Sequence, residues 1–256
     1  AIARNTAPNP RRMIIAEGLW AHNLLLRNDV FIDTFLWCPE AAYGDEARKR
    51  AVEVASRAHL AYQVSGKTLT RISERDKPDG LFSIAQLPMW EPRDVRLGRS
   101  SLVMVADGME IPGNLGTLIR TVDAAGADCL VLTNRRTRLT HPKVFRASQG
   151  MVLKTPVLDF ERTEDAITWL RSNDVHVYLA DTDGAKNYRS FDYSGTRTAF
   201  VSARSATESR NRGIQPVTSA CSSRCWARPT RSTCRSPPPS SSSKPAPRKT
   251  TGKHPC

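Results

Sequence analysis

The sequence predicts an α/β protein with a parallel sheet flanked by helices, preceded by a smaller α/β unit. Short apolar runs alternate with amphipathic runs over residues 12–201, as strands alternate with helices in such proteins. The continuous apolar run Leu102–Ala106 is typical of a strand buried inside a parallel sheet. This pattern stops at residue 202, and the residues beyond it contain no Leu, Phe, Tyr or Met. We therefore expect two folded units and a separate C-terminal tail.

The first unit, residues 1–90, is predicted from short apolar strands that alternate with helix-like runs. We expect strands at 13–16, 32–37, 61–64 and 81–85, and helices at 19–27, 45–57 and 68–73. A linker is expected at residues 91–100, where Pro92 and several charged residues interrupt the pattern.

The second unit, residues 101–201, repeats the alternation of strands and helices that produces parallel sheets. We expect strands at 102–106, 129–132, 175–180 and 198–201, and helices at 115–125, 141–147 and 163–172. In the first of these helices, four apolar residues follow the i, i+3, i+4, i+7 spacing of a buried face. These residues, which we expect to face the sheet, are Leu115, Leu118, Ile119 and Val122.

The charge of the chain is unevenly distributed. The 256 residues carry a net charge of +13, but residues 202–256 alone hold 11 Lys and Arg and a single acid, Glu208. The body of the protein is therefore close to charge balance, and the basicity belongs to the tail. The tail also contains twelve Ser and eight Pro. Such a segment cannot bury enough apolar surface to offset its ordering entropy, so we expect the tail to be disordered as written.

No apolar run approaches the roughly 20 residues that a membrane-spanning helix requires, so we expect a cytoplasmic protein without a membrane partner. Cys38 and Cys129 each stand alone in an apolar segment, which suits a reducing compartment. The cysteines of the tail do not match the spacing of any common zinc module. We therefore expect no metal site.

Two stretches of the second unit carry motifs. Glu110–Gly126 reads Glu-Ile-Pro-Gly-Asn-Leu-Gly-Thr-Leu-Ile-Arg-Thr-Val-Asp-Ala-Ala-Gly, and Pro142–Gly150 reads Pro-Lys-Val-Phe-Arg-Ala-Ser-Gln-Gly. Together they resemble the first two signature motifs of the SpoU (TrmH-type) RNA ribose 2'-O-methyltransferases, which belong to the knotted SPOUT superfamily. In the first unit, Ala16–Gly18 and Lys77–Gly80 resemble segments of the L30e-like RNA-binding domain that often precedes SpoU catalytic domains.

The resemblance implies methylation of a ribose 2'-hydroxyl in structured rRNA or tRNA, with S-adenosylmethionine as the methyl donor. It also implies a homodimer, and a cofactor pocket formed by a trefoil knot near the C-terminus. Residues 1–90 would be the domain that binds the RNA substrate, and residues 101–201 the catalytic domain. The alternative, from a different class, is a catalytically dead RNA-binding protein that lacks the cofactor-binding knot.

The resemblance also assigns roles to individual residues. The catalytic residues would be Arg120 and Asn114. The RNA-binding residues would be Arg146, Ser148, Gly116 and Thr117. The cofactor-binding residues would be Leu179, Ala180, Asp181 and Thr182, in a turn that follows a strand.

Several of these residues also have a plain structural interpretation. Arg120 could pair with Asp123 on a solvated helix face, whereas Gly116 could leave room there for a nucleotide backbone. Asn114, at the start of the helix, could cap free amides or help to hold a phosphate. Arg146 and Ser148 could be a helix-end arginine and a capping serine. Trp20, Trp37 and Trp90 could stack on bases or could pack in the core.

The third signature motif of the family is expected near residue 202 and is absent. Shifting the reading frame by one nucleotide allows codons for residues 202–209, 222–227 and 229–237 to encode Gly-Ser-Glu, Ile-Pro-Met-Leu-Gly and Ser-Leu-Asn-Val-Ser. These phrases resemble the missing part of the family pattern, in family order. We therefore hypothesise that residues 202–256 are an aberrant, frame-shifted tail, and we expect the chain as written to be inactive.

Overall fold

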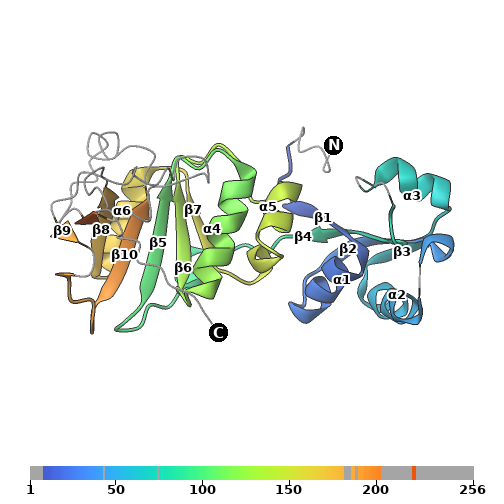
Figure 1. Ribbon diagram of the computed structural model, residues 1–256, viewed down its shortest axis with the longest axis horizontal. Helices are drawn as coiled ribbons and strands as arrows, with labels where there is room; N and C mark the ends of the chain where they lie inside the picture. The colour runs from blue at the N-terminus through green and yellow to red at the C-terminus, as the bar shows by residue number, and fades with distance from the viewer. Residues whose placement is uncertain are drawn as a thin grey trace, which may run out of the picture.

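The computed structural model describes residues 8–42, 44–73, 75, 77–181, 186–187, 190–202 and 221–222. Over these residues it contains one sheet of four strands and one of seven. The two α/β units lie side by side along the long axis of the molecule (Figure 1). The larger sheet is parallel and flanked by helices, and the smaller α/β unit precedes it, as the sequence predicts.

The first unit is built on a mixed four-stranded sheet of order β1-β4-β2-β3, in which β4 runs antiparallel to both of its neighbours. Its elements are β1 (Met13–Glu17), α1 (Gly18–Arg27), β2 (Ile32–Trp37), η1 (Pro39–Ala41), α2 (Asp45–Arg57), β3 (Leu60–Gln63), α3 (Gly66–Ile72) and β4 (Leu81–Gln86). Apolar residues of α1 and α2 pack with Ile14 and Ala85 on one face. On the other face, Leu69 of α3 packs with Cys38 and Phe82.

The second unit is built on a sheet of order β7-β6-β5-β10-β8-β11-β9, and every strand pair that the structure describes in it is parallel. Its elements are η2 (Pro92–Asp94), β5 (Leu102–Asp107), α4 (Pro112–Ala124), β6 (Cys129–Thr133), α5 (Pro142–Ala147), η3 (Met151–Leu153), β7 (Val157–Phe160), α6 (Thr163–Ser172), β8 (Val175–Asp181), β9 (Lys186–Asn187), β10 (Arg197–Ser202) and β11 (Cys221–Ser222).

Helices cover both faces of this sheet. Met104 and Ala106 of β5 point to the face where α4 and α5 pack, whereas Val103 and Val105 point to the face covered by α6. The alternation follows from the two-residue period of a strand. The predicted apolar stripe of α4 faces the sheet. The buried residues of the stripe are Leu115, Ile119 and Val122, and its half-buried residue is Leu118.

The strand order reverses beside β5. The chain proceeds from β5 through β6 to β7 on one side, and β8 and β10 lie on the other side, with β10 next to β5. In open α/β sheets, such a switch leaves a crevice at the carboxyl ends of the strands, where ligands bind. The carboxyl ends of β5, β10 and β8 meet at this point, since Ser202 pairs in register with both Ala106 and Ala180.

The boundaries agree closely with the sequence pattern for most elements. The helices at 45–57 and 163–172 begin and end at the predicted residues. Helix α4 begins at Pro112, three residues earlier than predicted, because proline is favourable at the first helical position. Strand β7 was not predicted. It is a four-residue edge strand that pairs with β6, and its short run follows directly after Pro156.

The two units share a continuous core. One cluster of buried residues extends from α1 of the first unit to α4, α5 and η3 of the second. At the junction, the rings of Trp20 and Phe145 lie edge to face with centroids 5.7 Å apart. Leu24 of α1 also reaches Gly150, the residue that precedes η3. The geometry between the units is therefore fixed by side-chain packing.

Candidate functional site

Helix α4 presents its predicted polar residues to solvent. Asn114, Thr117 and Arg120 are exposed on successive turns, while the opposite side of the helix is buried against the sheet. The alternative pairing of Arg120 with Asp123 is not found among the described residues, and Asp123 Oδ1 instead forms a salt bridge with Lys154 Nζ at 2.9 Å. Within the described part of the chain, Arg120 makes no ion pair. Arg120 is exposed to solvent.

The structure changes the expectation for Asn114. Helix α4 begins at Pro112, and its N-cap is Ile111, whose side chain makes no capping hydrogen bond. Asn114 is therefore the third helical residue and does not cap the helix. Its exposed amide side chain remains near the amino end of α4, at the carboxyl edge of the sheet. The hydroxyl proton of Thr117 is already used within the helix, because the hydroxyl donates a hydrogen bond to the carbonyl oxygen of Gly113 at 3.0 Å.

The prediction that Gly116 leaves room for RNA is wrong. Gly116 is buried where α4 crosses α5. A Cβ atom on Gly116 would lie 2.6 Å from Cβ of Ala147, 2.8 Å from the carbonyl oxygen of Val144 and 2.9 Å from the backbone nitrogen of Ser148. The absence of a side chain therefore lets two helix backbones approach each other and leaves no space for a nucleotide.

Ser148 likewise does not face RNA. Its side chain is fully buried at the C-cap of α5. Its hydroxyl donates to the carbonyl oxygen of Phe145 at 3.0 Å and accepts from the backbone N–H of Val152 at 3.4 Å. The structural interpretation of Ser148 as a capping residue is therefore correct, because both hydrogen-bonding roles of the hydroxyl are used inside the fold.

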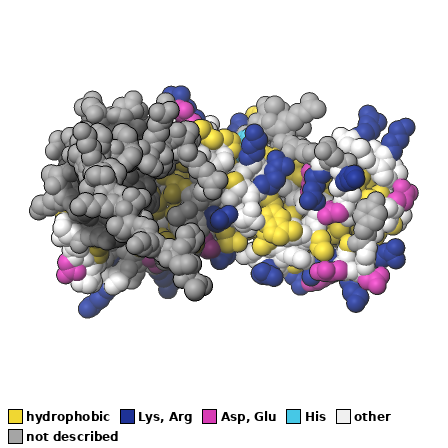
Figure 2. Space-filling view, viewed as in Figure 1, with side chains coloured by type: hydrophobic (Ala, Val, Ile, Leu, Met, Phe, Trp, Pro, Cys, Tyr) yellow, Lys and Arg dark blue, Asp and Glu magenta, His cyan; other side chains and the backbone are white. Residues whose placement is uncertain are grey.

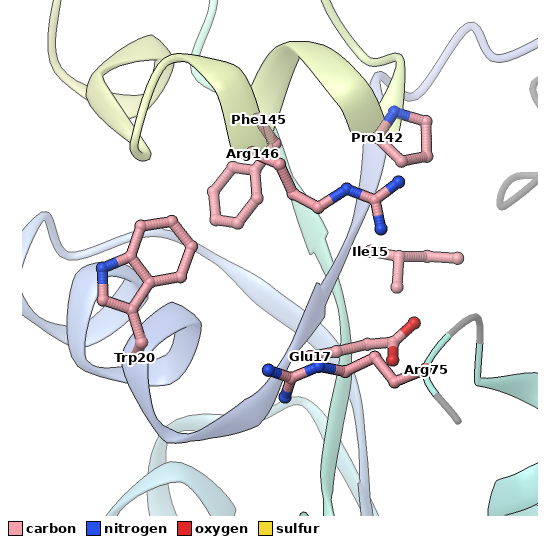
Figure 3. Close-up of a pocket in the computed structure, with 7 residues that line it drawn as sticks. All are labelled: Ile15, Glu17, Trp20, Arg75, Pro142, Phe145 and Arg146. Atoms are coloured by element: carbon pink, nitrogen blue, oxygen red, sulfur yellow. The ribbon is translucent and has the colours of Figure 1, made fainter. Parts of the chain in front are cut away.

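Arg146 is exposed on α5 and lines a pocket between the two units. Figure 3 shows Arg146 and Phe145 projecting from α5 toward residues of the first unit. The lining residues are Ile15, Glu17, Trp20, Arg75, Pro142, Phe145 and Arg146. Sequence reasoning suggested Arg146 and raised the possibility of base stacking for Trp20, but could not bring these residues together. Only the packing of α1 against α5 does so.

The predicted cofactor residues lie at the carboxyl end of β8. Leu179 is buried, and Ala180 is half-buried beside Ser202 of β10. Asp181 ends the strand, and Thr182 lies outside the described residues. The segments that would form a knot and carry the third motif also lie outside them. Across the sheet, Ala106, Ser202 and Ala180 place three small residues side by side on β5, β10 and β8.

A polar cluster that sequence reasoning missed fixes the neighbouring carboxyl ends of β5 and β6. Asp107 is buried, and its Oδ1 accepts a hydrogen bond from the hydroxyl of Thr133 at 2.8 Å. Asn134 Nδ2 donates both to Asp107 and to the hydroxyl oxygen of Thr163, the first residue of α6, the latter at 2.8 Å. The signal was available, since Asp107 and Thr133 each directly follow a predicted apolar strand.

Cys38 and Cys129 are not nucleophile candidates. Cys38 and Cys129 are both buried free thiols. Burial raises the pKa of the Cys129 thiol to about 12, with the charge of Asp128 adding to the effect. Cys129 therefore remains protonated. In the same described part of the chain, no group of three or more His, Cys, Asp or Glu side chains is arranged to hold a metal ion.

No helix among the described residues has both the length and the apolar character that crossing a membrane requires.

The predicted catalytic residue Arg120 and the predicted cofactor residues lie apart. Arg120 is about 12 Å along the axis of α4 from Pro112, at 1.5 Å per residue. Leu179 and Ala180 lie instead at the carboxyl edge, two strands away from β5.

Comparisons with known proteins agree with this arrangement. A family model described as SpoU rRNA Methylase family matches residues 101–202. The 23S rRNA (guanosine(2553)-2'-O)-methyltransferase RlmP of Bacillus subtilis is 26% identical over 140 residues, which cover 55% of this chain and 54% of that protein. The matches span 43% and 37% of two further curated relatives, so the chain aligns with about half their length or less.

Solved structures share the fold over both units. The AdoMet-bound rRNA methyltransferase from Sinorhizobium meliloti is 26% identical with a TM-score of 0.69, covering 88% of this chain and 81% of that one. A structure described as an RNA 2'-O ribose methyltransferase is 25% identical with a TM-score of 0.60, covering 75% and 72%. Residues 101–202 thus match the SpoU rRNA Methylase family, and solved rRNA methyltransferases share the fold over both units.

Proposed function

We propose that this protein is an RNA methyltransferase that transfers a methyl group from S-adenosylmethionine to a ribose 2'-hydroxyl of structured rRNA or tRNA. The match of residues 101–202 to the SpoU rRNA Methylase family supports methyl transfer to RNA, and the relatives named for 2'-O chemistry support the ribose. The observation that carries the proposal is the exposed Arg120 on α4. It lies in the matched domain, on a helix whose other charged residue, Asp123, is already paired with Lys154.

The residues at the carboxyl edge of the sheet fit a nucleoside-containing cofactor. Ala106, Ser202 and Ala180 form a row of small side chains at the switch in strand order, which is where open α/β sheets bind such ligands. Leu179 and Ala180, with Asp181 at the strand end, would hold S-adenosylmethionine, together with Thr182. When bound, the cofactor supplies an electrophilic methyl group on sulfur.

Arg120 and Asn114 would act on the RNA. A guanidinium is charged at every physiological pH and binds phosphate with two parallel hydrogen bonds, so Arg120 would fix the phosphate next to the target ribose. The same positive charge would favour loss of the 2'-hydroxyl proton by stabilising the oxygen that becomes negative. Asn114 would position the same nucleotide from the amino end of α4, and Thr117 lies between them on the exposed side.

The catalytic domain would act together with the first unit and with a second copy of the chain. The first unit would be an L30e-like domain, spanning residues 1–90 with the linker at 91–100, that binds the RNA substrate. The protein would act as a cytoplasmic homodimer. A second copy could bring Arg120 of one subunit to the carboxyl edge of the other, which one chain does not do over its described residues.

Residues 202–256 would be a frame-shifted tail in place of the third motif. The fold over residues 101–202 follows the family, and the family pattern ends where the apolar alternation ends. The coding DNA across codons 195–240 decides this point. Restored Gly-Ser-Glu, Ile-Pro-Met and Ser-Leu-Asn phrases would support the frame shift, and DNA that encodes none of them would rule it out.

The function is tested with two proteins, the chain as given and the chain with its reading frame restored. Each is incubated with S-adenosylmethionine carrying a tritiated methyl group and with unmodified rRNA or tRNA, and the RNA is digested to nucleosides. We expect 2'-O-methylnucleosides from the restored protein and none from the chain as given. A labelled base, or no labelled RNA from the restored protein, would contradict the proposed function. Transfer by the chain as given would contradict the proposal that its tail abolishes activity.

A matched pair of variants tests the role of Arg120 in the restored protein. Arg120→Ala should reduce the rate of methyl transfer by at least about 100-fold, while the affinity for S-adenosylmethionine measured by calorimetry stays unchanged. Arg171→Ala removes an arginine that is also exposed, from α6 on the opposite face of the sheet, and should leave both quantities unchanged. Equal rates for the two variants would exclude Arg120 from catalysis.

A further inference from the structure

We propose that the pocket between the two units binds an unpaired nucleotide of the RNA substrate. The base would lie against the exposed indole of Trp20, which packs on Phe145, and Arg75 and Arg146 would hold the adjacent phosphates. This inference rests on the proposed function, since it names how the RNA is held. It concerns a second site, separate from the carboxyl edge of the sheet where the cofactor residues lie.

The aromatic wall of the pocket is the first observation. Trp20 leaves 45% of its surface exposed, although its neighbour Phe145 is only 4% exposed. The edge-to-face contact with Phe145 restricts the indole, which still leaves nearly half of the residue exposed. Figure 3 shows the indole beside the pocket, across from α5. A large aromatic ring that is held rigidly and left exposed is suited to stack an unstacked base, because every base has a flat face.

The charges of the pocket are the second observation. Arg75 comes from the first unit and Arg146 from the second, so cations approach the pocket from both sides. Arg75 Nη1 pairs with Asp79 Oδ2 at 3.2 Å. Each guanidinium has five N–H donors, so this single bond leaves donors of Arg75 for a phosphate. Figure 2 shows several Lys and Arg side chains around exposed hydrophobic side chains near the junction of the two units, and such cations suit a polyanionic chain.

The carboxylate of Glu17 argues for a nucleotide over a simple anion. Glu17 lines the same pocket, and its Oε2 accepts a hydrogen bond from the hydroxyl of Ser73 at 2.7 Å. A small anion in the pocket would meet this negative charge directly. A nucleotide keeps its phosphate several bonds away from its base, and the base presents N–H donors on its edge. The aromatic, acidic and cationic groups therefore match the face of a base, the N–H donors on its edge and its phosphate.

The pocket lies where a bound nucleotide could orient the RNA relative to the second unit. Its walls belong to β1 and α1 of the first unit and to α5 of the second, and the same junction is part of a continuous core. A nucleotide held there would contact both units at once. It would therefore fix the direction in which the RNA leaves the first unit and approaches α4, where Arg120 is exposed.

The test measures RNA affinity of the full chain without any cofactor. The probe is a fluorescein-labelled RNA stem–loop with unpaired loop bases, compared with a fully paired RNA duplex of the same length, by fluorescence anisotropy. Trp20→Ala should weaken stem–loop binding by about ten-fold or more, in line with the loss of one stacked base, and should leave duplex binding unchanged. Trp20→Phe keeps a ring and should restore most of the affinity.

A matched pair tests the charges. Arg75 and Arg57 are both 49% exposed in the first unit, and each pairs with an acid one helical turn away in sequence. Arg75→Ala and Arg146→Ala should each weaken stem–loop binding several-fold more than Arg57→Ala does. A 4-thiouridine in the loop should crosslink on irradiation to the peptides that contain Trp20 or Phe145. Equal affinities for the Trp20→Ala and Arg57→Ala proteins, or crosslinks confined to other peptides, would overturn the proposal.

These measurements separate the pocket from the proposed function. If the restored protein transfers methyl groups and the pocket variants bind RNA normally, the pocket proposal alone fails. If the pocket variants lose RNA affinity and no methyl group is ever transferred, the pocket stands and the proposed function fails. Uridine monophosphate should compete only at far higher concentration than the stem–loop. Competition at similar concentration would overturn the assignment to RNA.

Discussion

His22 shows how one side chain can link the fold of the first unit to pH. It is fully buried, Nδ1 lies 2.8 Å from the carbonyl oxygen of Gly18, and Nε2 lies 2.8 Å from Oγ of Ser83. A carbonyl can only accept, so Nδ1 carries the proton and Nε2 accepts from the serine hydroxyl. Both nitrogens are satisfied in the neutral ring. Burial lowers the pKa of His22 from 6.5 to about 4.

This pKa predicts acid sensitivity. Between about pH 6.5 and pH 4 the unfolded chain binds a proton at His22 that the folded chain does not, so the free energy of unfolding falls as the pH falls through this window. The full loss would be about 3 kcal/mol, most of it below pH 6. Urea unfolding at a series of pH values measures it. His22→Gln should flatten this part of the profile, whereas His59→Gln, at an exposed position, should not. Equal profiles for all three proteins would show that His22 does not set the pH dependence.

At the scale of elements, the contact between α4 and α5 determines how the two motif helices lie. The crossing occurs at Gly116, where backbone atoms of Val144 and Ser148 lie within 3 Å of the place a Cβ would occupy. Backbone cannot move aside as a flexible side chain can. The second motif is therefore held against the first by the absence of a side chain at Gly116.

The substitution Gly116→Ala should consequently destabilise the protein by about 1–3 kcal/mol in urea unfolding, as overpacking does. Gly113→Ala is the matched control on the same helix, since a Cβ there would have no atom within 4 Å. That variant should be unchanged or up to about 1 kcal/mol more stable, because alanine favours helix. A Gly116→Ala protein as stable as the control would contradict the close approach of the two helices.

The elements also show what the sequence could predict. The apolar period located α2 and α6 to the residue, because both helices have a charged face and a clear buried face. It missed β7, since four residues at a sheet edge carry too little pattern. In the candidate site, the helical spacing of apolar residues in α4 predicted that Arg120 would be exposed. The apolar period could not show that Gly116 and Ser148 are buried, because their burial depends on where α5 packs. Residue type does not help either, since glycine and serine are also common at ligand-binding positions.

At the scale of the whole molecule, the two units are joined by packing and by charge. Arg12 lies before β1, and its Nη2 donates to the carbonyl oxygen of Pro88 at 3.2 Å. Burial lowers the pKa of Arg12, and the negative charge of Asp159 on β7 opposes this effect. Asp159 itself accepts from Arg135 Nε at 2.7 Å. Charges from both units therefore lie close to one another at the junction.

The contact between Leu24 and Gly150 allows the coupling of the units to be measured. Gly150 has a φ of +75°, and a Cβ there would lie 2.3 Å from Cδ1 of Leu24. Gly126 has a φ of +65° but open space around it, so Gly126→Ala should cost about 1–2 kcal/mol from backbone strain alone. Gly150→Ala should cost about 1–3 kcal/mol more than that, because it also overpacks the junction.

Leu24→Ala removes the obstructing side chain, so Gly150→Ala in the Leu24→Ala protein should cost no more than Gly126→Ala does. The difference between the two backgrounds is the interaction energy across the junction. Urea unfolding of the four proteins of this cycle, with Gly126→Ala beside them, measures it. An equal cost of Gly150→Ala in both backgrounds would mean that the two units do not support each other at this contact. A reduced cost would instead show that mutations in α1 reach the second motif helix through the core, without touching the RNA or the cofactor residues.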